Sequence, residues 1–241
     1  MSERPTVAVF RPADERLERA LAVLGELDVD GLADPMLAVE PTGHQPRGDA
    51  DYTVLTSKTG ADLLAGTGWQ PGGRLCAIGA ATADALAAAG YGVDIVPDTY
   101  SSVGLVERLE GEVDGARVEV ARSDHGSPVL LDGLTAAGAY VHETVLYRLT
   151  RPPEAGVSAE RAAAGELDGA LFSSSLTVEH FLEAAEHRDV REAALAGLDA
   201  AVVGAIGEPT AETARDAGID VAVVPDDADF EALARAVVAR L

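Results

Sequence analysis

The chain has 241 residues, enough for one large domain or for two of about 120 residues each. Its 18 basic and 41 acidic residues give a formal net charge of −23, and 47% of the residues are hydrophobic, enough to build real cores. A surface this acidic repels phosphate backbones and anionic lipids, so neither nucleic acid nor a membrane is an expected partner. The single cysteine, Cys76, excludes an intrachain disulfide and any multi-cysteine metal centre. No basic and then apolar signal region opens the sequence, and we expect a cytoplasmic globular protein.

The kinds of charged residue in the chain are also informative. Lys58 is the single lysine, and only 4% of the residues are aromatic. Dispersed carboxylates with almost no lysine suit a very salty cytoplasm, where the Debye length is about 3 Å at 1 M salt and exposed charges repel one another little. The composition therefore predicts a halophilic protein, the alternative being an ordinary acidic one.

Short apolar runs alternate with alanine-rich amphipathic stretches along the whole chain, a pattern typical of parallel sheets covered by helices. Gly90 and Gly218 each follow a helical stretch and precede a strand, as a C-terminal glycine does. The expected strands are Thr6–Phe10, Thr53–Leu55, Leu75–Ile78, Val93–Val96, Arg117–Ala121, Val141–Tyr147, Gly169–Phe172, Ala200–Val203 and Val221–Val224. The expected helices include Ala13–Leu27, Lys58–Ala65, Ala80–Ala89, Ser102–Glu110, Pro128–Ala137, Leu176–Glu186, Pro209–Ala217 and Asp229–Leu241.

An internal duplication runs through the sequence. The block that starts at Ile78-Gly79 recurs at Ile206-Gly207, and the same offset aligns Gly90 with Gly218 without a gap. Two earlier blocks repeat in the same order: the strand ending in Phe10-Arg11 matches the one ending in Ala121-Arg122, and Leu55-Thr56-Ser57 matches Phe172-Ser173-Ser174. We therefore expect two similar halves, roughly 1–114 and 115–241.

Hydroxyl and glycine residues lie where strands run into helices. The four such turns are Thr56-Ser57, Gly79–Thr82, Ser173–Ser175 and Gly207–Thr210. Strand ends of this kind line the ligand crevice of parallel α/β sheets, and free N–H groups at helix starts bind carboxylates or phosphates. For each residue alone, simple capping of the helix is the alternative. Four turns repeated across the duplication favour a cleft that binds a polyanion.

Together these blocks resemble the uroporphyrinogen-III synthase family. The matching residues are Leu55-Thr56-Ser57, Ile78-Gly79 with Thr82-Ala83, Tyr100-Ser101-Ser102 with Gly104-Leu105, Leu146-Tyr147-Arg148, Phe172-Ser173-Ser174 and Ile206-Gly207 with Thr210-Ala211. The resemblance runs from Val7 to Val237. Where the family commonly has Gly-Pro-x-Thr in its last block, this chain has Glu208 before Pro209.

The resemblance implies an α/β fold of two similar doubly wound parallel-sheet domains joined by a two-strand linker, with the substrate between them. On this chain the first domain would comprise 1–35 and 151–241, the second 41–143, and the linker strands 36–40 and 144–150.

The reaction implied by the resemblance is the cyclisation of the linear tetrapyrrole hydroxymethylbilane, with inversion of its terminal ring, to uroporphyrinogen III and water. Such an enzyme is a cyclising hydro-lyase of porphyrin and haem biosynthesis. No metal or organic cofactor is expected. Beyond the substrate, the expected partner is the upstream enzyme that forms the bilane, and the protein is expected to be a monomer.

Individual roles follow from the same resemblance. Tyr147 matches the tyrosine of the second linker strand and would protonate or hydrogen-bond the departing hydroxyl, the alternative being an aromatic that packs at the linker. The residues expected to bind substrate carboxylates are Ser57, Thr82, Ser173, Ser174 and Thr210, together with the cations Arg11 and Arg122, either of which could instead form a structural ion pair. A non-catalytic two-domain binder of a small polyanionic ligand remains the alternative function.

Overall fold

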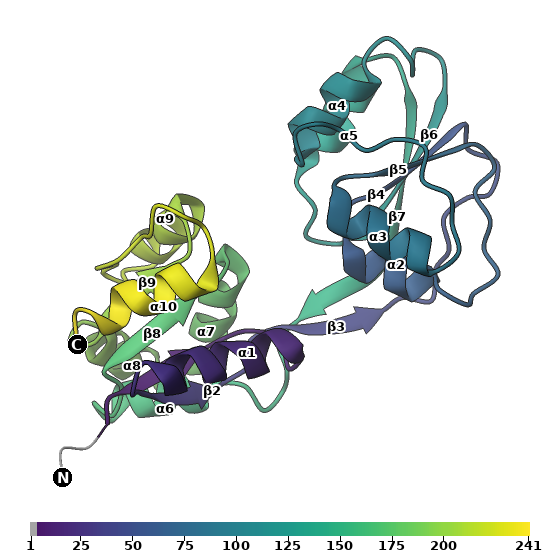
Figure 1. Cartoon of the computed structure of the whole chain (residues 1–241). Helices are drawn as coiled ribbons and strands as arrows, with labels where there is room; N and C mark the ends of the chain where they lie inside the picture. Colours follow the sequence, from purple (N-terminus) through teal and green to yellow (C-terminus); the bar gives the residue numbers. More distant parts are fainter. Residues whose placement is uncertain (1–3) are drawn as a thin grey trace. The chain divides into compact units, whose positions relative to one another are not determined.

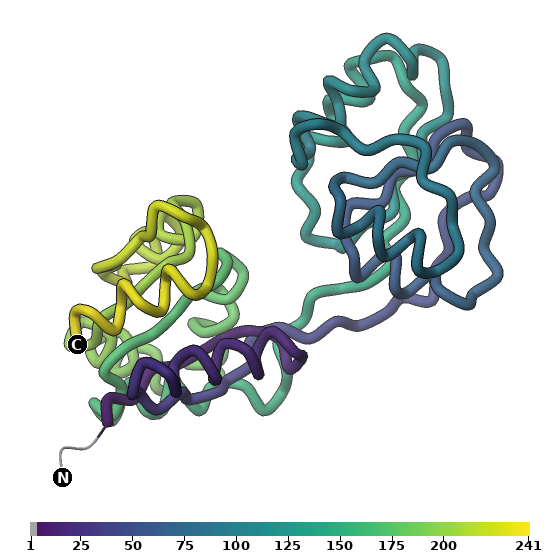
Figure 2. The backbone as a smooth tube through the Cα atoms, viewed as in Figure 1, coloured from purple at the N-terminus to yellow at the C-terminus, as the bar shows by residue number. Residues whose placement is uncertain are grey.

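The computed structural model describes residues 4–241, and its internal contacts divide the chain into two compact units. Unit 1 comprises Met1–Ala38 and Thr150–Leu241, and unit 2 comprises Val39–Leu149. The backbone leaves unit 1 once and returns to it once, as the tube in Figure 2 shows. The first three residues of the expected 1–35 segment lie outside the described part of the chain.

The sheet of unit 1 has four parallel strands in the order β2-β1-β8-β9, of which β2, β8 and β9 are labelled in Figure 1. They are β1 (Thr6–Val9), β2 (Asp30–Ala33), β8 (Gly169–Phe172) and β9 (Val202–Ala205). Strands β1, β8 and β9 are buried on both faces, which is why they read as continuous apolar runs rather than alternating ones.

Helices cover both faces of this sheet. Helices α1 (Glu15–Glu26) and α10 (Phe230–Val238) pack on the face that includes Val7, Val9 and Leu171. The opposite face, with Phe10 and Phe172, is covered by α6 (Val157–Ala163), α7 (Ser175–His187), α8 (Arg191–Leu198) and α9 (Glu208–Asp216).

The sheet of unit 2 has the order β3-β7-β6-β4-β5. Its strands are β3 (Ala38–Pro41), β4 (Tyr52–Leu55), β5 (Arg74–Ala77), β6 (Arg117–Ser123) and β7 (Tyr140–Thr150). Helices α2 (Lys58–Leu64) and α3 (Ala80–Ala88) pack on one face, and α4 (Ser102–Leu109) and α5 (Pro128–Ala136) on the other. None of the helices between residues 4 and 241 is long and apolar enough to span a bilayer.

The predicted fold class is confirmed, with local differences that have physical reasons. Strand β2 was not expected because its sequence, Asp-Gly-Leu-Ala, is mostly exposed and carries no apolar run. The strands expected at Val93–Val96 and Val221–Val224 shorten to single parallel bridges at Ile95 and Val223. Helices α6 and α8 were also missed.

The segment 144–150, expected as a linker strand, is part of a longer strand. It is the second half of β7, which pairs with β6 as far as Tyr147. The division between the units falls after Leu149 on this strand and after Ala38 on β3.

Candidate functional site

The predicted site residues lie at the carboxyl ends of strands in each unit. In unit 2, Ser57 follows β4 and Thr82 lies in the first turn of α3, after β5. In unit 1, Ser173 and Ser174 follow β8, and Thr210 lies in the first turn of α9 after β9. Each unit therefore carries its own set at the sheet edge where ligands bind in parallel α/β folds.

Two of the serines are used as helix caps. Ser57 Oγ accepts the backbone N–H of Gly60 at 3.0 Å, which caps α2. Ser174 forms a reciprocal capping box with Thr177 at the start of α7. Ser173, just before this cap, is half-buried, and its hydroxyl makes no hydrogen bond to any residue from 4 onward.

The two threonines behave differently. Thr82 and Thr210 are buried, with exposed fractions of 4% and 5%, and neither hydroxyl has a hydrogen-bond partner within the described chain. The residues that cap their helices are Gly79 and Gly207, which offer no side-chain acceptor. Helix α3 thus begins with the free N–H groups of Ala80 and Ala81 beside an unpaired hydroxyl, an arrangement suited to a carboxylate. The first turn of α9 offers the N–H of Glu208, because Pro209 has none and that of Thr210 bonds to Gly207.

The turn that contains Glu208 has the same backbone hydrogen bond as its repeat counterpart in unit 2. The N–H of Thr210 donates to the carbonyl of Gly207 at 3.1 Å, and the N–H of Thr82 donates to that of Gly79 at 3.2 Å. Glu208 turns away to pair with Arg215 at 2.6 Å. The two turns therefore share their hydrogen-bonded backbone, as the duplication predicts, although Pro209 has no N–H where Ala81 has one.

Tyr147 lies in the core of unit 2, with only 6% of its surface exposed. Its hydroxyl donates a hydrogen bond to Ser57 Oγ at 3.0 Å. The neighbouring Leu146 is buried in the same cluster, although successive strand residues normally face opposite sides. A β-bulge opposite Arg122 and Ser123 permits this, since it shifts the register so that Ser123 pairs with Tyr147.

The two arginines at equivalent strand ends are not equivalent in structure. Arg122 is 6% exposed; its Nε lies 2.6 Å from a carboxylate oxygen of Glu143, and its Nη1 donates to the carbonyl of Ser127. Arg11 has no ion pair with a described residue, and its Nε is buried without a hydrogen-bond partner. The geometry favours the structural ion pair for Arg122 and leaves Arg11 available to an anion.

Cys76 is buried in β5, and burial raises the pKa of its thiol to about 12. It is therefore a protonated core residue at neutral pH rather than a nucleophile. Across residues 4–241, no three His, Cys, Asp or Glu side chains are grouped as a metal site requires.

Comparison with known proteins places the chain in a family. The family model described as uroporphyrinogen-III synthase HemD matches residues 18–235. A protein of Methanothermobacter thermautotrophicus named "Putative uroporphyrinogen-III synthase" is 31% identical over 186 residues, which cover 73% of this chain and 72% of that protein. The chain belongs to the uroporphyrinogen-III synthase family.

Solved structures of the family share the fold. A mutant uroporphyrinogen III synthase of Thermus thermophilus has a TM-score of 0.64 at 21% identity and covers 96% of both chains. The uroporphyrinogen-III synthetase of Helicobacter pylori has a TM-score of 0.68 at 14% identity and covers 99% of this chain and 100% of its own. At these identities the likeness supports the architecture alone.

The family match spans most of the candidate site but not all of it. Tyr147 and the serines and threonines lie within the matched residues, whereas Arg11 precedes them. Sequence reasoning did not anticipate the contact between Arg11 and Phe230, because these residues lie at opposite ends of the chain.

Proposed function

We propose that this protein is a uroporphyrinogen-III synthase, which cyclises hydroxymethylbilane with inversion of the terminal ring and releases water. The observation that carries the proposal is a pair of largely buried threonines, Thr82 and Thr210, in a chain of this family. Each lies at a helix start with a glycine cap, and neither hydroxyl has a hydrogen-bond partner in the described chain. As a reaction class this is a cyclising hydro-lyase.

The substrate carries many carboxylates, and the proposed site offers matching donors. The free N–H groups at the start of α3 and that of Glu208 at the start of α9, with the hydroxyls of Thr82 and Thr210, bind carboxylates of the substrate, and Ser173 adds a hydroxyl. Ser57 and Ser174 contribute to substrate binding in part by capping the starts of α2 and α7. Since the linear substrate closes spontaneously without inversion, holding one geometry is the main catalytic task.

Tyr147 is proposed as the group that assists loss of the hydroxyl. The leaving oxygen must take up a proton as its bond to carbon breaks, and a phenol can donate one. In this structure the phenolic proton is directed at Ser57 Oγ. Ser57 accepts two hydrogen bonds, so its own O–H remains to donate to the substrate, and the Tyr147–Ser57 pair acts as one donor unit.

The setting is also part of the proposal. The net charge of −23 and the single lysine support the proposal that the protein works in a salt-rich cytoplasm. We further propose that it works as a monomer without a metal or organic cofactor and receives its substrate from the enzyme that forms the bilane.

Incubation with freshly generated hydroxymethylbilane, followed by separation of the product isomers, tests the activity. We expect uroporphyrinogen III in excess of the uninverted isomer that forms without enzyme. Saturable binding of the bilane with only the uninverted isomer as product would instead support the non-catalytic binder.

A further inference from the structure

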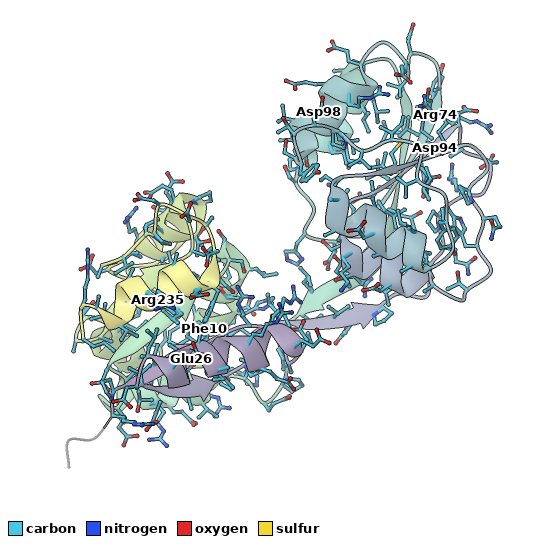
Figure 3. The ribbon with its side chains drawn as sticks, viewed as in Figure 1. Phe10, Glu26, Arg74, Asp94, Asp98 and Arg235 are labelled. Carbon is cyan, nitrogen blue, oxygen red and sulfur yellow. The ribbon has the colours of Figure 1, made fainter. Side chains whose placement is uncertain are left out.

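Unit 1 contains a cavity of about 220 Å³ between the start of α1 and the start of α10. Arg11, Arg16 and Arg19 line it on one side, and Asp229, Phe230 and Glu231 line it on the other. In Figure 3, Glu26 on α1 and Arg235 on α10 mark the two helices, and Phe10 marks the residue between β1 and Arg11.

Arg11 is held in this cavity by its aromatic neighbour. The centre of its guanidinium group lies 4.6 Å from the centroid of the Phe230 ring, a cation–π distance. Burial, and then the nearby charge of Arg16, lower the pKa of Arg11, and the carboxylate of Asp14 only partly opposes them. Its buried Nε has no acceptor in the described chain.

The acidic side chains around the cavity already have partners. Asp14 pairs with Arg16 at 2.5 Å, and Glu231 pairs with Arg235 at 2.6 Å. Asp229 caps α10 and accepts the N–H groups of Glu231 and Ala232 at 2.8 and 3.0 Å. None of these carboxylates forms an ion pair with Arg11.

The duplication explains why Arg11 lacks a partner. In unit 2, Val120 is in register with Glu143, which holds Arg122. Val9 is the repeat equivalent of Val120, and in unit 1 it is in register with Ala33, which has no carboxylate. Beside Arg11, unit 1 therefore has no carboxylate at the position where unit 2 has Glu143 beside Arg122.

We propose that the Arg11 cavity binds a carboxylate of the ligand. This carboxylate pairs with Arg11 as the carboxylate of Glu143 pairs with Arg122 in unit 2. The inference rests on the proposed function in one respect: the carboxylate is a side arm of the linear tetrapyrrole. The cavity volume corresponds to several water-sized groups of about 30 Å³ each, which accommodates a short carboxylate arm.

Arg11→Met tests this, since methionine keeps an unbranched apolar side chain against Phe230 and removes the charge. Arg161→Met is the matched control: it removes one positive charge from unit 1, where Arg161 pairs with Glu166 on the surface. In isomer-resolved kinetics we expect Arg11→Met to raise KM about tenfold or more with kcat within about twofold, as loss of a charge-assisted contact does. Arg161→Met should leave KM unchanged.

A second readout separates this inference from the proposed function. Succinate, titrated at constant potassium chloride, should shift the Nε–H resonance of Arg11 in nitrogen-15 spectra and should have no such effect on Arg11→Met. If the protein forms uroporphyrinogen III but Arg11→Met keeps the KM of the unmodified chain, the inference is overturned and the proposed function stands. If no uroporphyrinogen III forms, a saturable succinate shift supports the cavity alone, and its absence overturns both.

Discussion

The Tyr147 hydroxyl lies 3.0 Å from Ser57 Oγ, and the same oxygen accepts the N–H of Gly60 at 3.0 Å. One serine therefore joins a helix start to a buried phenol. The two residues are 90 positions apart in the sequence, and the bulge between β6 and β7 turns Tyr147 toward the α2 face of the sheet.

Tyr147→Phe should lower the rate of uroporphyrinogen III formation by at least about tenfold, since general-acid assistance contributes about 10²–10⁴ in rate. The melting temperature should change little because the ring keeps its packing in the core. Isomer-resolved kinetics on the folded variant measures this, and the uninverted isomer should accumulate. Unchanged turnover would remove Tyr147 from the mechanism.

Ser57→Ala and Ser101→Ala form a matched pair. Each serine caps a helix by accepting an N–H three residues later at 3.0 Å, but only Ser57 contacts Tyr147. Both substitutions should cost about 1 kcal/mol of unfolding free energy, as the loss of a cap does. Only Ser57→Ala should also slow formation of uroporphyrinogen III; equal rates in the two variants would argue for capping alone.

Thr82→Val and Thr210→Val should weaken substrate binding without destabilising the fold. Valine keeps the shape of these buried residues, and the hydroxyl that it replaces has no hydrogen-bond partner in the described chain to lose. We expect KM to rise roughly tenfold, more than kcat falls, with an unchanged or higher melting temperature. Thr177→Val is the control, since its hydroxyl bonds to Ser174 and its loss should lower stability by about 1 kcal/mol.

Salt should stabilise the protein strongly. With a net charge of −23, repulsion between surface carboxylates is large at low ionic strength and is mostly screened at 1 M, where the Debye length is about 3 Å. Between 0.1 and 2 M potassium chloride we expect the melting temperature to rise by about 10 °C or more, equivalent to roughly 3–5 kcal/mol. Sucrose, which does not screen charge, is the control; full stability in dilute buffer would contradict the halophilic interpretation.

The sequence by itself determined the alternation of strands and helices, the duplication and the family. These are properties of local patterns: apolar runs that are buried on both faces, and glycines at helix ends where φ is positive, as at Gly90 and Gly218. It could not show strand β2, whose stability comes from pairing with β1 rather than from its own residues.

Only the tertiary structure decided what each candidate side chain does. Ser57 and Thr82 follow similar turns in the sequence, yet one hydroxyl caps a helix and the other has no partner. Arg11 and Arg122 occupy equivalent positions in the repeat, but Arg122 is neutralised because Glu143 lies beside it, whereas Arg11 has Ala33 in the corresponding register. Such differences depend on which distant residues the sheet brings into contact, and local patterns along the sequence do not reveal those contacts.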